Sequence, residues 1–75
     1  EFLTAYDATI RAVDERFDVP GSTLPKLIRM AWSNGCTISQ NRRRQFEGVV
    51  QPEVFDLIEA SLRECRNPSA PAERV

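Results

Sequence analysis

Three consecutive arginines, Arg42, Arg43 and Arg44, are the residues whose type and spacing in this 75-residue chain best suit binding chemistry. Guanidinium groups bind carboxylates and phosphates through paired hydrogen bonds. On a helix the three would span roughly 200° of the circumference, so at least one flanks the buried face while the others point outward. The run therefore either pairs with neighbouring acids on a solvated face or contacts phosphate or an acidic patch on a partner.

Acidic residues near the C-terminal end form a second candidate surface. The net charge is only −1, but the charges are distributed along the chain in acidic, basic and again acidic segments. Opposite charges on one small domain favour head-to-tail contact between copies or docking on a complementary protein core. The predicted partner-contact residues are Arg42, Arg43, Arg44, Glu53, Asp56 and Glu59.

The sequence lacks the motifs of common catalytic sites. It contains no histidine, which removes the commonest general base and the usual serine and cysteine triads. The glycines at 21, 35 and 48 stand singly and do not form a phosphate-binding loop. Trp32 and Phe46 lie among apolar neighbours and are interpreted as core rather than as stacking platforms. We therefore predict that the chain is not an enzyme and holds neither a cofactor nor a metal.

The two cysteines, Cys36 and Cys65, have no spacing that indicates a disulfide framework or a metal site. They are predicted to be small buried thiols in a reducing cytoplasm, with a single disulfide between them as the alternative. No stretch approaches the roughly 20 apolar residues of a membrane span, and no signal-peptide pattern is present. The chain does not begin with methionine, which indicates either a fragment of a longer protein or removal of the initiator methionine by processing.

Apolar spacing in the first half predicts two helices. The first covers residues 2–17, and its apolar stripe consists of Phe2, Leu3, Tyr6, Ile10, Val13 and Phe17. The second helix starts after Ser22 or Thr23 and stops at Asn34-Gly35. Its inner face is predicted to consist of Leu24, Leu27, Ile28, Ala31 and Trp32. Residues 36–38 could form a short strand, with Ile38 inserted into the core.

Two further helices are predicted in the second half. Ser39 caps a short helix over residues 40–47, which Gly48 ends, and Val49-Val50 then packs inward. Pro52 begins a helix over residues 52–66, because the first helical position tolerates proline best. Its inner face is predicted to consist of Val54, Phe55, Ile58, Leu62 and Cys65. Residues 67–75 have the composition of a disordered tail.

These elements predict an all-α fold, with one small four-helix domain over residues 1–66 and at most one very short strand pair. The third helix, the Gly48 turn and the fourth helix have the spacing of a helix-turn-helix or winged-helix core. A small residue is usual four positions before the turn glycine, where Arg44 stands. The fourth helix also exposes acids that would repel nucleic-acid phosphates. A nucleic-acid-binding domain is therefore the alternative, not the first, prediction.

Residues scattered from Asp14 to Leu62 resemble the C-terminal region of Fic-family proteins. That region contains a pattern Asn-Gly-Gly-x-Leu-Ser-x-x-Lys-Arg, followed by a phenylalanine and an acidic closing helix. The residues that carry the resemblance are Phe17-Asp18-Val19-Pro20, Leu24-Pro25-Lys26-Leu27-Ile28-Arg29, Asn34-Gly35, Ile38-Ser39, Arg42-Arg43, Phe46, Val54 and Ile58-Glu59. The chain departs from the family pattern at Cys36, at Asn41-Arg42 and at Gln51-Pro52.

The resemblance implies an accessory role. Fic proteins typically transfer AMP from ATP to target hydroxyl groups, using a His-Pro-Phe-x-x-Gly-Asn-Gly-Arg motif that is absent here. The chain would then lie downstream of the catalytic core of a bacterial Fic-type adenylyltransferase. It would pack on that core, mediate self-association or help to choose targets. We therefore predict a non-catalytic, cytoplasmic protein–protein interaction domain, without a membrane partner.

Overall fold

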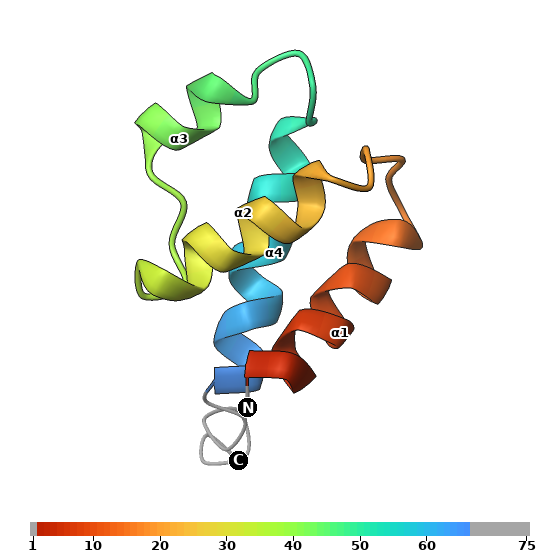
Figure 1. Ribbon diagram of the computed structural model, residues 1–75, viewed down its shortest axis with the longest axis vertical. Coiled ribbons are helices and arrows are strands. Elements are labelled where there is room, and N and C mark those ends of the chain that lie inside the picture. Colours follow the sequence, from red (N-terminus) through yellow and green to blue (C-terminus); the bar gives the residue numbers. More distant parts are fainter. Residues whose placement is uncertain (1, 67–75) are drawn as a thin grey trace.

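The computed structural model describes residues 2–66, and these residues form a small all-α domain, as predicted (Figure 1). The helices are α1 (Phe2–Asp14), α2 (Thr23–Ser33), α3 (Gln40–Gln45) and α4 (Pro52–Arg66). The tail predicted over residues 67–75 lies outside the described residues. Within the described part of the chain, no helix is long and apolar enough to cross a membrane.

α1 and α4 make the most extensive contact between helices, and α2 packs across both of them. Figure 1 shows α3 at the far end of the molecule from the N-terminus, attached beside the start of α4. The predicted inner faces of α2 and α4 are largely confirmed, because Leu24, Leu27, Ile28 and Ala31 are buried together with Val54, Phe55, Ile58 and Leu62. Trp32 and Cys65 are only half-buried at the edge of this core.

The buried side of α1 agrees with the predicted stripe at Val13, which is completely buried, and differs from it elsewhere. Small residues, Ala5 and Thr9, are completely buried, whereas Leu3 is 73% exposed. Small side chains let two helix backbones approach closely, and the Thr9 hydroxyl donates a hydrogen bond of 2.9 Å to Ser61 Oγ on α4. The larger residues Phe2, Tyr6, Ile10 and Phe17 are only partly buried against the core. The helix also ends at Asp14 rather than at residue 17 as predicted, so Phe17 lies beyond it. Burial on α1 therefore follows the position of α4 rather than the size of the apolar side chains.

This close approach leads to a stability prediction. We expect Ala5→Leu to lower the free energy of unfolding by about 1–3 kcal/mol, because extra methylenes in a well-packed contact force neighbouring groups apart. Ala60→Leu, at an exposed position of α4, is the matched control and should change stability by less than about 0.5 kcal/mol. Urea denaturation followed by circular dichroism measures both, and equal losses would show that α1 and α4 do not approach as described.

The two glycine turns form as predicted, but the segments that follow them differ in part from the prediction. Gly35 and Gly48 both have positive φ angles, of 67° and 88°, at the predicted helix ends. Residues 36–38 do not form the short strand, since the only bridge within residues 2–66 is an isolated one between Glu47 and Val50. Ile38 nevertheless inserts into the core as expected, with 4% of its surface exposed. Val49 does not pack inward, because it is 50% exposed.

α3 is shorter than predicted. It ends at Gln45 rather than at residue 47, and Phe46 forms its C-terminal cap. Residues 46–51 then connect α3 to α4, which begins at Pro52 as expected. The order of short helix, glycine-containing connection and long helix places the arginine run on α3 beside the first turns of α4.

Candidate functional site

The arginine run lies on α3, and hydrogen bonds fix both the start of this helix and the segment that precedes it. Ser39 Oγ accepts a hydrogen bond of 3.3 Å from the backbone N–H of Arg42, which is the predicted N-cap. The backbone N–H of Ile38 donates to Glu59 Oε2 on α4 at 2.7 Å. The segment that carries the arginines is therefore fixed to α4 before α3 begins.

Arg43 is the one arginine of the run that turns toward α4. Its guanidinium lies 2.9 Å from Glu59 Oε2 and 3.2 Å from Asp56 Oδ1. Its Nε–H also donates to the Ile38 carbonyl at 3.1 Å, and the group sits 5.4 Å from the centre of the Phe55 ring. Partial burial lowers the pKa of Arg43, but the hydrogen bonds and charges of Glu59 and Asp56 outweigh it, so the net pKa is raised. Arg43 therefore stays charged and ties α3 to α4.

The three residues of the predicted acidic face of α4 differ in burial and in their ion pairs. Glu59 is largely buried, with 13% of its side chain exposed, and it binds both Arg43 and the Ile38 amide. Asp56 is 72% exposed and forms an ion pair with Arg43 on the solvent side. Glu53 lies in the first turn of α4 and is exposed. Two of the three acids therefore pair within the chain, and Glu53 remains as an outward charge.

Arg42 and Arg44 lie on opposite flanks of α3 and are exposed. Within residues 2–66 neither of them forms an ion pair. Arg42 borders a depression on the α2 side of α3. Arg44 borders another, whose lining includes Val50, Pro52 and Phe55. Pairing with neighbouring acids is therefore observed for Arg43 alone, while contact of Arg42 and Arg44 with a partner stays a prediction.

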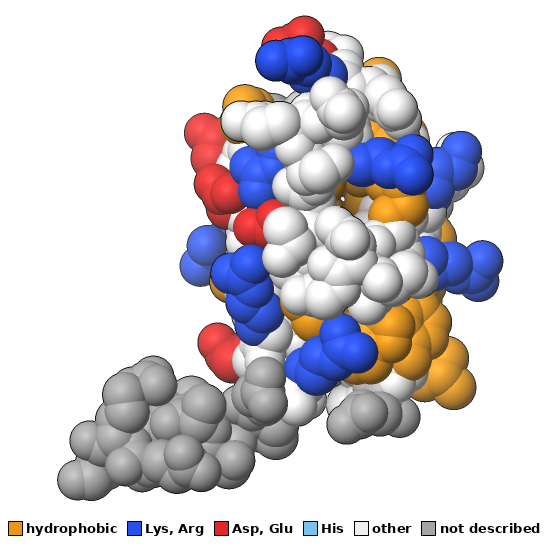
Figure 2. Space-filling view, turned by 90° about the vertical axis from the view of Figure 1, so that its left-hand side faces the viewer, with side chains coloured by type: hydrophobic (Ala, Val, Ile, Leu, Met, Phe, Trp, Pro, Cys, Tyr) orange, Lys and Arg blue, Asp and Glu red, His pale blue; other side chains and the backbone are white. Residues whose placement is uncertain are grey.

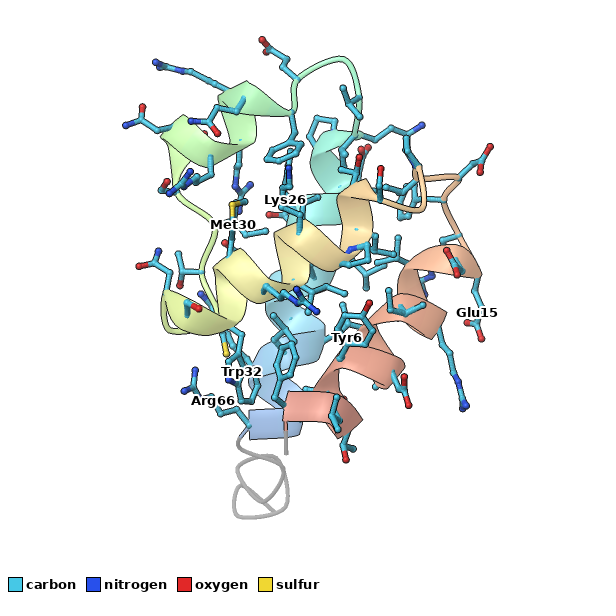
Figure 3. All side chains as sticks on the ribbon, viewed as in Figure 1. Tyr6, Glu15, Lys26, Met30, Trp32 and Arg66 are labelled. Atoms are coloured by element: carbon cyan, nitrogen blue, oxygen red, sulfur yellow. The ribbon has the colours of Figure 1, made fainter. Side chains whose placement is uncertain are left out.

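The cationic surface extends from α3 onto α2. Lys26 and Arg29 are exposed on α2, and Figure 3 shows Lys26 and Met30 on the side of α2 that faces α3. No acidic residue occurs between Asp18 and Glu47. In Figure 2 the right-hand edge carries cationic but no acidic side chains, and acidic side chains gather at the left and the top. The fold therefore keeps most of the positive charge of the middle segment apart from the acids of α4.

A second feature, an aromatic cluster, lies at the other end of the domain. Phe2 packs against Tyr6 at 5.7 Å and against Trp32 at 5.5 Å between ring centres. The Arg66 guanidinium lies 4.4 Å from the centre of the Trp32 ring, and Figure 3 shows these two side chains together at the ends of α2 and α4. The interpretation of Trp32 and Phe46 as core residues is confirmed in part, since both are half-buried and pack against the core. The pairing of Phe2 with Trp32 had no local signal in the sequence.

Both cysteines are free thiols in this structure. Cys36 is buried, as predicted, and its Sγ accepts a hydrogen bond of 3.4 Å from Arg66 Nη1. Cys65 was also predicted to be buried but is only half-buried. Among residues 2–66 no three histidine, cysteine or carboxylate side chains gather in a group able to hold a metal ion.

The comparisons with known proteins assign neither a family nor a function to this chain. Comparison of the chain with protein-family models, with curated proteins and with solved structures finds no match. The resemblance to the C-terminal region of Fic proteins therefore stays a prediction. The function has to be inferred from the charged surface of the domain itself.

Proposed function

We propose that this chain is a non-catalytic helical interaction domain that binds an acidic protein surface through the cations of residues 19–46. The observation that carries the proposal is the difference between the arginines of α3. Arg43 is neutralised by Glu59 and Asp56, while Arg42 and Arg44 are exposed without an ion pair within the described residues. Following the Fic resemblance, the proposed partner is the catalytic core of a longer parent protein or a second copy of the domain.

The inner ion pairs make the outer arginines suitable for docking. Because Arg43 and the Ile38 amide attach α3 to α4, the outward arginines stand on a fixed helix rather than on a mobile loop. A fixed charge loses less conformational entropy when it meets its partner. The exposed acids of α4, Glu53 and Glu64, favour a protein partner over nucleic acid, because they would repel a phosphate backbone.

The test uses charge reversal on α3 with a matched control on α1. We expect Arg42→Glu/Arg44→Glu to weaken binding of a labelled glutamate-rich peptide by at least about tenfold at low salt, because like charges then face each other. The control, Arg11→Glu/Arg16→Glu, makes the same charge change at exposed positions near the end of α1 and should bind like the unmodified chain. Fluorescence anisotropy measures binding, and circular dichroism checks that both variants are folded.

Two results would overturn the proposal. If the α1 and α3 variants lose binding equally, the peptide responds to net charge and not to the surface of α3. If a random DNA duplex binds more tightly than the peptide, with a log affinity that falls steeply with log salt, the chain is a nucleic-acid-binding domain instead. Sedimentation of the unmodified chain at increasing concentration shows whether the acidic surface belongs to a second copy.

A further inference from the structure

A polar depression lies between the end of α2 and the start of α3. It has a volume of about 410 Å³ and is lined by Met30, Ser33, Asn34, Thr37, Ser39 and Arg42. The lining contains two serines, a threonine, an asparagine and an arginine but no acidic residue. Figure 2 looks onto this side of the molecule, where uncharged polar surface occupies the centre, cationic side chains lie on both sides of it, and acidic side chains lie at its left and above it. Such a lining is suited to an anion.

The hydroxyl groups of this depression are arranged to donate. Thr37 Oγ1 already accepts a hydrogen bond of 3.1 Å from Arg63 Nη2, and Ser39 Oγ accepts from the backbone of Arg42. A hydroxyl that accepts inside the protein still has its own O–H to give to a ligand. Asn34 Nδ2 uses one of its two N–H groups on the Thr37 carbonyl, at 3.3 Å, and retains the other. The depression therefore offers hydrogen-bond donors to whatever enters it.

The charges around the depression also favour an anion. Arg42 lines it, and Arg63 reaches it from α4 through the hydrogen bond to Thr37. Both arginines are exposed, and neither is ion-paired within residues 2–66. The carboxylate tied to this segment is that of Glu59, which bonds to Ile38 and is neutralised by Arg43. Two positive charges therefore act on the depression, and its lining contributes no negative charge.

We propose that this depression binds the phosphate monoester of a phosphorylated serine or threonine in the partner protein. The inference rests on the proposed function in that it takes the partner to be a protein. A phosphate monoester carries a charge of about −1.5 to −2 and three strong acceptor oxygens, which match two arginines and several outward donors in one place. A nucleic-acid backbone is a poorer match, because its phosphates repeat along a track and would also meet the exposed acids of α4.

The test is a nuclear magnetic resonance titration of the ¹⁵N-labelled chain. The probes are a short peptide of alanine and glycine around one phosphoserine and the same peptide with serine. We expect saturable shifts of the amide signals of residues 33–42 with the phosphopeptide only. Thr37→Val removes one donor without changing shape and should weaken phosphopeptide binding about tenfold, the usual effect of losing a hydrogen bond to a charged group. Thr4→Val, at an exposed position of α1, should leave binding unchanged.

Arg63→Gln provides a second variant, since it removes a charge beside the depression and should also weaken binding. The spectra themselves show whether each variant is folded. Equal binding of the two peptides would overturn the inference, as would shifts spread evenly over all cationic residues, or tighter binding of single-stranded DNA at residues 33–42. If the glutamate-rich peptide still needs Arg42 and Arg44 in that case, the proposed function stands alone. Saturable phosphopeptide binding without any glutamate-peptide binding would support the phosphate site and remove the broader proposal.

Discussion

Replacing Leu62 with alanine lowers the free energy of unfolding by about 2–5 kcal/mol, because the buried side chain is lost and a cavity remains. Leu62 has no exposed surface and lies on the helix that contacts both α1 and α2. A domain of this size has a total stability of roughly 3–10 kcal/mol. The variant should therefore be partly or largely unfolded at 25 °C. Urea denaturation followed by far-ultraviolet circular dichroism gives the loss directly.

Leu3→Ala is the matched control for this variant. The substitution is chemically identical, but Leu3 is 73% exposed on α1. Its loss should change the free energy of unfolding by less than about 0.5 kcal/mol, as is usual at surface positions. A cost for Leu3→Ala similar to that for Leu62→Ala would mean that the first turn of α1 packs its large apolar side chains inward. The pattern of large residues along α1 would then describe the core better than the small residues Ala5 and Thr9.

The second large effect is expected at Glu59. Glu59→Ala removes the carboxylate that binds both Arg43 and the Ile38 amide. It leaves the guanidinium of Arg43 with Asp56 as its remaining ion pair and the Ile38 N–H without its acceptor. Breaking a fully buried pair costs about 3–5 kcal/mol. Because the Arg43 side chain is 25% exposed, water compensates in part, and we expect a loss of about 1–3 kcal/mol. Amide hydrogen exchange at Ile38 should become faster in the same variant.

Asp56→Ala is the control for Glu59→Ala, since both acids pair with the same guanidinium. Asp56 is 72% exposed, so its ion pair is screened by water and should contribute no more than about 1 kcal/mol. Denaturation and hydrogen exchange at Ile38 distinguish the two variants. Equal losses, or unchanged exchange at Ile38 in Glu59→Ala, would show that α3 is held by its core contacts and not by this carboxylate.

Local patterns in the sequence determined the helices and much of the core. The inner faces of α2 and α4 followed from apolar residues three and four positions apart, because burial of a helix against a core repeats with the helical turn. Ser39, Pro52 and Gly35 marked helix ends for reasons that involve only neighbouring backbone groups, whereas Gly48 marked the turn between α3 and α4 but not the last residue of α3.

Only the tertiary structure decided which residues meet across the chain. The sequence indicated that at least one arginine of the run must flank the buried face, but it could not select Arg43, because its partners Asp56 and Glu59 lie on another helix. The burial of Ala5 and Thr9 likewise depends on where the axis of α4 runs. Contacts between distant segments are set by helix packing, which short-range periodicity does not encode. For the same reason, the polar depression beside α3 has no signal in the sequence, because it depends on how the fold places Met30, Arg42 and Thr37, the last of which binds Arg63 of α4.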